Sequence, residues 1–352
     1  MLVKIKRNNL IEALESTNRA VSKKPQVEIM GYTHIECSEN IKITGYNFDL
    51  GISVLVDGEV LHKGTCCFLG ATVLNFIKKC SDDIVELTVD NNQMIVACGK
   101  PKLKLAVKDD NDYPILPQLE NATEFEIENL SDKIQKVAFC AAENAQKPIL
   151  AGINLKISKN MLVMSGCDGS RLSSISEESN SAKVNITIPK STTEHIKAIV
   201  GNNKVTVKYD NKSLKITLDN TTLYARLMSG EYLDLSKIIS RSGGITFGAD
   251  GQKVSEAIER LAVVAESNTP LVVKLEPNLL SLYCSTPKAE LEEYITTDYQ
   301  GDELKLGMNF RYFAEAVRGT GKLTFDVLSA NAGVIIREED RVQMIMPVAV
   351  RA

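Results

Sequence analysis

The residues that could bind a metal or act as nucleophiles are scattered through this chain. There are eight cysteines, at positions 37, 66, 67, 80, 98, 140, 167 and 284, and three histidines, at 34, 62 and 195. No Cys-x-x-Cys pair occurs, and the histidines lack the spacing of zinc ligands. Most of the cysteines fall inside apolar strand or helix patterns, so we expect reduced, buried thiols and no metal site.

A serine lies beside an acid in the segment Asp168-Gly169-Ser170-Arg171, which suggests a nucleophile. A nucleophilic serine needs a positioned base, and in one large class of hydrolases it stands on a Gly-x-Ser-x-Gly turn. That turn is absent, as are phosphate-binding loops and Gly-x-Gly-x-x-Gly segments, and nothing assigns His195 a place near the serine. We therefore expect neither catalysis nor a cofactor. An enzyme remains the alternative, and turnover lost in Ser170→Ala would support it.

The composition is that of a soluble globular protein. The 352 residues are 44% hydrophobic and 24% charged, with a net charge of −4. This length suits two or three domains. No apolar run could span a membrane and no signal peptide is evident, so we expect a cytoplasmic protein. The charge allows a local basic face, but the absence of tryptophan disfavours base stacking as a mode of nucleic-acid binding.

A repeat with a period of about 120 residues organises the chain. The same apolar helix spacing occurs at 130, 134, 137, 138 and 141 and at 254, 258, 261, 262 and 265, and less completely at Leu10, Leu14 and Val21. Each repeat then predicts a second helix, at 71–80, 191–200 and 309–318, preceded by a strand. Three strands follow it, with Asn and Asp at the turns 90–92 and 210–211.

Each repeat thus reads helix, strands, helix, strands. That order is typical of an α+β fold with antiparallel sheets. Loop-like stretches at 109–122 and 240–244 place the boundaries of three repeated domains at 1–120, 121–243 and 244–352.

Four segments carry a resemblance to a known family. Cys167-Asp168-Gly169-Ser170-Arg171-Leu172 resembles the family's Thr-Asp-Gly-His-Arg-Leu, and Pro148-Ile149-Leu150-Ala151-Gly152 resembles the strand entry before it. Asn309-Phe310-Arg311-Tyr312 resembles Asn-x-x-Tyr at the last helix, and Met346-Pro347-Val348 resembles the family's C-terminal motif. In their order and spacing these segments resemble the beta subunit of bacterial DNA polymerase III, the sliding clamp, over the whole chain.

The resemblance implies three clamp-type domains, with antiparallel sheets outside and helices lining a central hole. Two chains would close head to tail into a homodimeric ring that encircles duplex DNA, without catalysis. The implied partners are DNA, the catalytic subunit of DNA polymerase III, the clamp loader and other proteins with clamp-binding peptides. A monomeric scaffold with the same fold, or a clamp of a plasmid or phage, remains an alternative.

A ring needs only weak, sequence-independent attraction to phosphates, which basic residues on the inner helices would supply. The acidic residues would then lie mostly outside. Lys24 and Asn144 lead the candidates, since they lie near the family's DNA contacts. The full set is Arg19, Lys23, Lys24, Lys78, Lys79, Lys133, Lys136, Asn144, Lys147, Lys190, Lys197, Arg260, Arg311, Arg318 and Lys322.

The resemblance also implies a pocket between the second and third domains for a peptide with apolar anchors. Arg171 and Tyr312 would hydrogen-bond the peptide backbone. Departures from the family at Cys167, Ser170 and Leu233, and in the longer C-terminal tail, leave the preferred peptide open. By position the pocket residues are Leu150, Cys167, Gly169, Arg171, Leu172, Leu233, Lys237, Ile238, Asn309, Tyr312, Met344, Met346, Pro347 and Val348.

The dimer interface would join the first domain of one chain to the third domain of the other. By position, the strand residues Leu103 and Leu105 would meet Val263 and Val264 on a helix. Pairing this edge strand across the subunits would also protect it from aggregation. We expect ion pairs from Lys102, Lys104 and Lys108 to acids such as Glu293 or Asp298.

Overall fold

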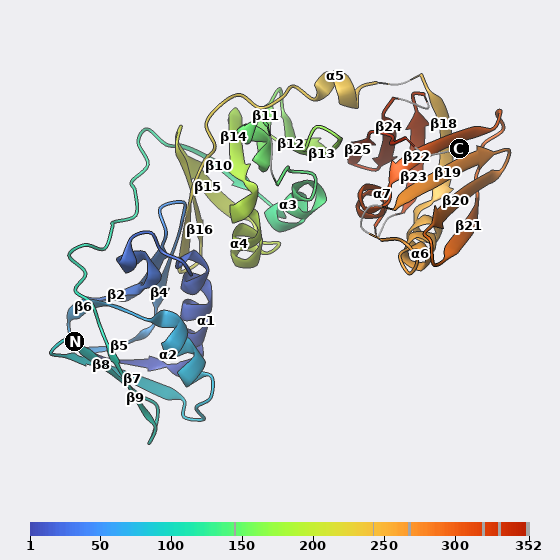
Figure 1. Ribbon diagram of the computed structural model, residues 1–352. Coiled ribbons are helices and arrows are strands. Elements are labelled where there is room, and N and C mark those ends of the chain that lie inside the picture. Colours follow the sequence, from blue (N-terminus) through green and yellow to red (C-terminus); the bar gives the residue numbers. More distant parts are fainter. Residues whose placement is uncertain (144–145, 242, 267–268, 319–320, 330–331, 350–352) are drawn as a thin grey trace. The chain divides into compact units, whose positions relative to one another are not determined.

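The same order of elements occurs three times along the chain (Figure 1). The computed structural model describes residues 1–143, 146–241, 243–266, 269–318, 321–329 and 332–349. Within them, each repeat has one strand, a helix, four strands, a second helix and three strands, and the first repeat has an additional strand, β5. Two compact units divide the chain inside the second repeat. Unit 1 is Met1–Asp132 with Ser191–Ser229, and unit 2 is Lys133–Lys190 with Gly230–Ala352.

The first repeat lies in unit 1. It comprises β1 (Leu2–Lys6), α1 (Arg7–Thr17), β2 (Thr33–Cys37), β3 (Ile41–Tyr46), β4 (Leu50–Val56), β5 (Gly58–His62), β6 (Gly64–Phe68), α2 (Gly70–Ile77), β7 (Ile84–Asp90), β8 (Gln93–Ala97) and β9 (Lys102–Ala106). Short 3₁₀ turns at Asn18–Ala20 and Glu28–Gly31 follow α1. Asn91 and Asn92 both have positive φ in the β7–β8 hairpin, as a tight primed turn requires.

The second and third repeats follow the same plan. The second comprises β10 (Thr123–Ile127), α3 (Leu130–Ala138), β11 (Gly152–Ser158), β12 (Met161–Cys167), β13 (Arg171–Glu178), β14 (Val184–Pro189), α4 (Lys190–Val200), β15 (Val205–Tyr209), β16 (Ser213–Leu218) and β17 (Thr221–Arg226). After a short helix, α5 (Ser236–Ile239), the third comprises β18 (Ile245–Asp250), α6 (Gly251–Leu261), β19 (Pro270–Glu276), β20 (Leu279–Ser285), β21 (Glu290–Thr296), β22 (Leu304–Asn309), α7 (Phe310–Ala316), β23 (Lys322–Val327), β24 (Val334–Glu338) and β25 (Arg341–Ile345).

The predicted helices and the three strands after each second helix are confirmed, with two corrections. The first helix of each repeat ends sooner than its apolar spacing suggests, so Val21, Ala141 and Ala265 lie beyond it. In the second and third repeats the chain tightens there into i→i−3 hydrogen bonds, such as Ala141 N–H to the Ala138 carbonyl, and this continues the turn without a helix. The opening strands β1, β10 and β18 were missed.

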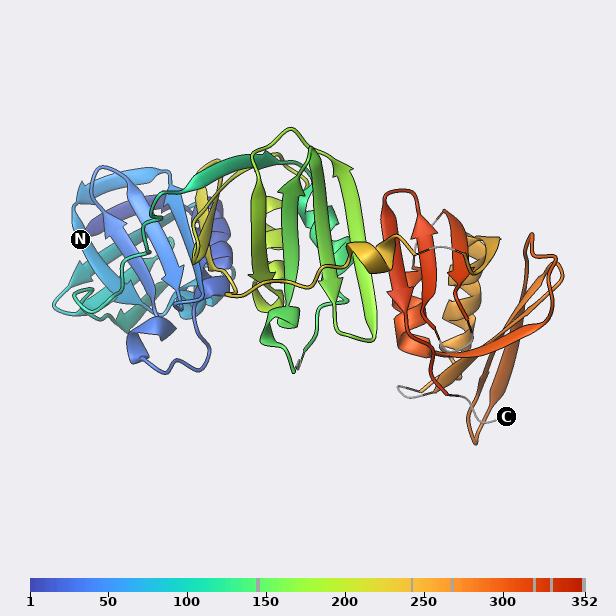
Figure 2. The same cartoon turned by 90° about the horizontal axis from the view of Figure 1, so that it is seen from above.

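Two of the four sheets run from one repeat into the next (Figures 1 and 2). In unit 1, β17 of the second repeat pairs antiparallel with β4 of the first, and we name this pairing joint 1. In unit 2, β25 of the third repeat pairs antiparallel with β13 of the second, and we name it joint 2. The strand orders are β5-β1-β7-β8-β9, β10-β15-β16-β17-β4-β3-β2-β6, β14-β11-β12-β13-β25-β24-β23-β18 and β21-β20-β19-β22.

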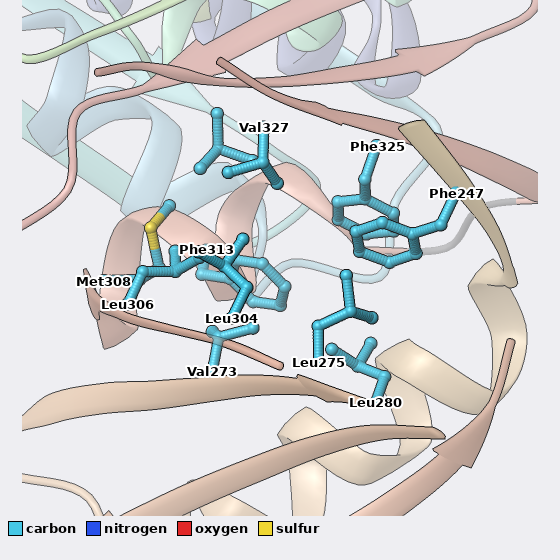
Figure 3. A pocket seen from close by; sticks show the side chains of 11 residues that line it. Phe247, Val273, Leu275, Leu280, Leu304, Leu306, Met308, Phe313, Phe325 and Val327 are labelled. Atoms are coloured by element: carbon cyan, nitrogen blue, oxygen red, sulfur yellow. The ribbon is translucent and has the colours of Figure 1, made fainter. Parts of the chain in front are cut away.

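The core of the third repeat lies between its two sheets (Figure 3). Phe247 stacks on Phe325 with ring centroids 4.9 Å apart, and Phe313 of α7 packs against the same ring. The small gap that these side chains leave is lined only by apolar residues. Because such a gap offers water no hydrogen-bond partner, it is a packing void and not a binding site.

Candidate functional site

Ser170, the serine of the enzyme alternative, lies in a hairpin turn between β12 and β13. The Asp168 carboxylate accepts hydrogen bonds from the Ser170 and Arg171 backbone N–H groups, each at 2.9 Å, and Gly169 has φ +94°. Asp168 also binds the Arg171 side chain at 3.0 Å, so its oxygens are occupied in shaping the turn. Unit 2, which contains Ser170, has no histidine in its sequence, so within that unit no imidazole base is available to Ser170.

An apolar cluster lies beneath this turn. Its buried members include the predicted pocket residues Leu150, Cys167 and Leu172, and Ile238 and Met344 pack against it. Met344 comes from the third repeat, because it lies opposite Leu172 in joint 2. The structure therefore gathers five of the predicted pocket residues from two repeats into one cluster.

Three buried members of this cluster were not predicted, namely Ala142, Tyr232 and Leu235. Tyr232 and Leu235 come from the segment that connects the second and third repeats, and the Tyr232 hydroxyl donates to the Gly152 carbonyl at 3.5 Å. The sequence does hold a signal for Tyr232 and Leu235. Tyr113 and Leu116 have the same spacing in the segment that connects the first and second repeats.

The Cys167 thiol is a packing group. Burial raises its pKa, and the Gly169 N–H donates to its sulfur at 3.4 Å. All eight cysteines are free, and seven are buried while Cys80 is half-buried. Burial raises the pKa of Cys37, Cys66 and Cys67 to about 12. Within the described residues no cluster of potential metal ligands occurs.

Arg171 is placed differently from the prediction. Its side chain is only 6% exposed, and it contacts Asp168, Glu315 and the Phe139 carbonyl. Burial acts to lower the pKa of the guanidinium, but hydrogen bonds and charge from Glu315 and Asp168 outweigh it and raise the pKa overall. Arg171 is therefore committed within the protein, and the expectation that it hydrogen-bonds a peptide backbone does not fit its surroundings.

The remaining predicted pocket residues lie on the rim or have structural contacts. Asn309 caps α7, because its side-chain oxygen accepts from the Tyr312 N–H at 3.1 Å. Val348 pairs with Gly307 of β22 through its N–H at 2.9 Å, so this part of the tail lies along the third repeat. The exposed or half-buried rim residues are Leu233, Lys237, Tyr312, Met346 and Pro347.

Joint 1 offers a comparison within the same chain. Its cluster contains Tyr46, Tyr113 and Tyr224, with Leu116 packed against it. Tyr46 and Tyr224 occupy the hairpin and strand positions that Cys167 and Met344 hold at joint 2. The Leu116 side chain packs directly against Gly51, where a Cβ atom would lie 2.3 Å from its Cδ2 atom. At these two positions joint 1 thus carries larger side chains than joint 2.

The predicted DNA contacts fall into two groups. Several basic side chains have partners in the chain: Lys78 with Glu15 at 2.6 Å, Lys136 with Asp340 at 3.4 Å, Lys190 with the Ala141 carbonyl at 2.8 Å, Lys197 with Glu194 at 2.8 Å and Arg260 with Glu293 at 2.7 Å. Lys78 and Arg260 remain exposed, and exposed ion pairs are weak, so these two cations can still reach phosphate, whereas Lys136, Lys190 and Lys197 are half-buried. The exposed remainder is Arg19, Lys23, Lys24, Lys79, Lys147, Arg311, Arg318 and Lys322.

Two predicted DNA contacts need separate treatment. The Lys133 side chain is 8% exposed and pairs with Glu177 at 2.9 Å. This burial does not fit a phosphate contact, because Lys133 stands on the helix face that packs inward. Asn144 lies outside the described residues, so its placement does not bear on the prediction.

The predicted dimer residues lie at an unpaired sheet edge and beyond a helix. Leu103 and Leu105 are half-buried on β9, the edge strand of its sheet. Val263 is 86% exposed, but it and Val264 follow α6, which ends at Leu261, and are not in the helix.

The acids expected to pair with the lysines beside Leu103 are already engaged. Arg260 binds both carboxylate oxygens of Glu293 at 2.7 Å, and Asp298 accepts from the Gly248 N–H at 2.5 Å. Lys108 pairs with Glu28 at 2.6 Å. These acids and Lys108 thus have partners within the chain, and the ion pairs expected across the interface stay a prediction.

None of the helices in the described residues has the length and apolar character that crossing a membrane requires.

Solved structures of similar fold cover the whole chain. A putative DNA polymerase III beta subunit from Eubacterium rectale matches with TM-score 0.93 and 20% identity over 99% of both chains. The sliding clamp of Bacillus subtilis matches with TM-score 0.93 and 22% identity over 100% of both chains. Among curated proteins, the "Beta sliding clamp" of Staphylococcus aureus is 24% identical over 334 residues, 89% of each chain.

Family models divide the chain into three adjoining matches. The N-terminal domain of the DNA polymerase III beta subunit matches residues 1–117, the central domain 124–234 and the C-terminal domain 238–348. Together they span nearly all of the sequence, in the order of the three structural repeats. The chain belongs to the DNA polymerase III beta subunit family, the bacterial sliding clamps.

Proposed function

We propose that two copies of this chain close into a ring that encircles duplex DNA and tethers replication proteins to it, without catalysis of its own. Family membership supports this function. The observation that carries it is the use of sheet edges: the chain forms two joints from equivalent strands and leaves one strand of each kind with an unpaired outer edge. In the described residues, these are β9 and β21.

Both joints pair their strands in one register. At joint 1, Leu223 lies opposite Ile52, and at joint 2, Gln343 lies opposite Ser173. Each of these residues is the third after a two-residue hairpin turn. The fourth residue of one strand therefore lies opposite the second of the other, as Tyr224 lies opposite Gly51.

The same register applied to β9 and β21 places lysines opposite glutamates and a leucine opposite a leucine. Both strands follow two-residue turns, closed by Cys98 N–H to the Pro101 carbonyl and by Thr286 N–H to the Ala289 carbonyl. Opposite charges across an antiparallel pair contribute about 0.2–1 kcal/mol each. The resulting pairs are Leu103 with Leu291, Lys102 with Glu292 and Lys104 with Glu290.

This pairing replaces the ion pairs expected from sequence with exposed, complementary ones. The lysines on β9 and the glutamates at 290 and 292 are exposed, whereas Leu103 and Leu291 are half-buried. The contact joins different surfaces of two copies, and two such contacts close a dimer by symmetry. Val263 follows α6, which packs against β21, so it would lie near this interface.

The basic residues described above would face DNA inside such a ring. A topological link needs no tight binding, so exposed cations that exchange with counter-ions are sufficient and permit sliding. Lys24, Lys79 and Lys147 are exposed on loops and at a helix end, and they lead this set.

Joint 2 would supply the docking site for partners. Its apolar cluster under the β12–β13 turn is rimmed by Leu233 and Met346, each about one-third exposed. Burying two apolar side chains of a peptide would contribute about 1.5–3 kcal/mol each. With backbone contacts this suggests a dissociation constant on the order of micromolar, which suits the exchange of partners.

The proposal is tested by the link to DNA. The protein is loaded onto nicked circular DNA with the clamp loader of its source bacterium and ATP, and bound protein is separated by gel filtration. Cutting the circle should release it, because a ring slides off free ends. Circles cut but blocked at both ends by bound protein should retain it. Equal retention on open and blocked linear DNA would mean ordinary contact binding and would contradict the ring.

A further inference from the structure

The Arg171 guanidinium has every nitrogen engaged at joint 2. Nε donates to Asp168 at 3.0 Å, Nη2 donates to the Phe139 carbonyl at 2.7 Å, and Nη1 binds the Glu315 carboxylate. Glu315 stands on α7 of the third repeat, so this ion pair links the β12–β13 turn to that helix. Each nitrogen thus has a partner in the chain, and the flat faces of the guanidinium are free to pack on aromatic rings.

One of those faces lies on the ring of Tyr312. The Arg171 Cζ atom is 4.0 Å from the ring centroid, and the exposed Arg311 lies 5.4 Å from the same centroid. Tyr312 is half-buried and its backbone N–H is held by Asn309. A cation over an aromatic face is stabilising, and more so when it is partly desolvated, as Arg171 is. The position of the Tyr312 ring therefore depends on where Arg171 is held.

The network is specific to joint 2. Arg171 is the first residue after its hairpin turn, and the equivalent residue at joint 1 is Leu50. Glu315 is the sixth residue after Asn309, and the equivalent sixth residue after Pro189 is His195. Joint 1, whose cluster is filled by its own tyrosines, thus has neither the arginine nor the carboxylate.

We propose that Glu315 and Arg171 are positioning residues for the peptide pocket, which hold the Tyr312 ring as one of its walls. This inference rests on the proposed function of joint 2 as a docking site. Glu315 acts through Arg171: without its carboxylate, the guanidinium keeps Asp168 and the Phe139 carbonyl but loses its ion pair to α7. The pocket would then lose its ordered wall although Glu315 itself touches no peptide.

A double-mutant cycle in the full-length protein tests this role. The probe is a fluorescein-labelled peptide with leucine and phenylalanine anchors, and its affinity is measured by fluorescence polarisation. Glu315→Gln should weaken binding about fivefold, which corresponds to a coupling of about 1 kcal/mol. In a Tyr312→Ala background the same change should have no further effect, because the wall is already gone. Glu256→Gln on α6 is the matched control and should bind as wild type.

The outcomes separate this inference from the pocket itself. If Glu315→Gln binds the peptide as tightly as wild type, or loses as much affinity in the Tyr312→Ala background, the positioning role is wrong. If wild type itself does not bind the peptide, the docking function of joint 2 fails first. Should Glu315→Gln unfold, Arg171→Lys replaces it: a lysine keeps the charge but cannot stack, and weaker binding with an unchanged melting temperature is expected.

Discussion

Side-chain size at a few positions distinguishes the two joints. Cys167, Gly169 and Met344 at joint 2 correspond to Tyr46, Phe48 and Tyr224 at joint 1. The backbone pairing is the same, so the two apolar clusters differ in the side chains that stand at these positions. Phe48 even adopts φ +72°, where glycine is favoured, and its ring packs on Tyr46 with centroids 5.7 Å apart.

Met344→Tyr should therefore close the pocket. The larger side chain would occupy at joint 2 the volume that Tyr224 fills at joint 1, and the affinity for the labelled peptide should fall at least about tenfold, since an anchor worth 1.5–3 kcal/mol loses its place. Fluorescence polarisation measures this. Tyr224→Met is the matched control at joint 1 and should leave the peptide affinity unchanged. Peptide binding that survives Met344→Tyr would place the docking site elsewhere.

Helix α7 is capped by Asn309, a residue that the family resemblance assigns to the peptide pocket. The Asn309 side chain accepts from the Tyr312 N–H, which is one of the donors that a helix start leaves unsatisfied. Asn309→Ala should lower the free energy of unfolding by about 1 kcal/mol, while Asn309→Asp should retain it, because aspartate caps equally well. Chemical denaturation measures the difference.

Peptide affinity then tells the two roles apart. If Asn309 acts only as a cap, Asn309→Asp should bind the labelled peptide as wild type does. If Asn309→Asp keeps the stability but loses peptide affinity as Asn309→Ala does, the amide contacts the peptide, as the sequence resemblance implies.

Whether a contact joins residues near or far apart in the sequence decides what could be predicted from the sequence. The helix at 130–138 and the hairpin at Asn91 and Asn92 follow from local periodicity and turn chemistry, and both are confirmed. The opening strands, such as Thr123–Ile127, were missed because five residues with alternating acids give a weak pattern.

Contacts between residues far apart in the chain could not be predicted from the sequence. Nothing near Leu172 indicates that Met344 lies opposite it, and nothing near Arg171 indicates Glu315 as its partner. The pocket residues were therefore proposed from resemblance, whereas the burial of Arg171 and Lys133 could be found only from the folded chain.

At the scale of the whole molecule, the threefold repeat leaves each chain with edge strands that a second copy can pair. Each joint pairs the last strand of one repeat with the third strand between the two helices of the preceding repeat, and within the described residues the same two kinds of edge remain unpaired at β9 and β21. Exposed strand edges are templates for association. A second copy satisfies both edges in one closed assembly, which an isolated monomeric scaffold would leave exposed. Sedimentation should therefore report two chains at micromolar concentration.

Charge reversal tests the register of that contact. Lys102→Glu with Lys104→Glu, and separately Glu290→Lys with Glu292→Lys, each place like charges opposite one another at both contacts of a homodimer. Each variant alone should be monomeric in sedimentation at low salt, since like charges opposite one another destabilise strand pairs.

Mixing the two variants should restore a dimer. In the mixed pair, one contact sets new glutamates against new lysines, and the other retains the original lysines and glutamates, so both are complementary. Raising the salt concentration should partly rescue each single variant, because exposed charges are screened over about 8 Å at physiological ionic strength. Reversal at Lys4 and Lys6 of β1, which take no part in the contact, is the control. If each variant alone stays dimeric, or if the mixture stays monomeric, then β9 and β21 do not meet in this register.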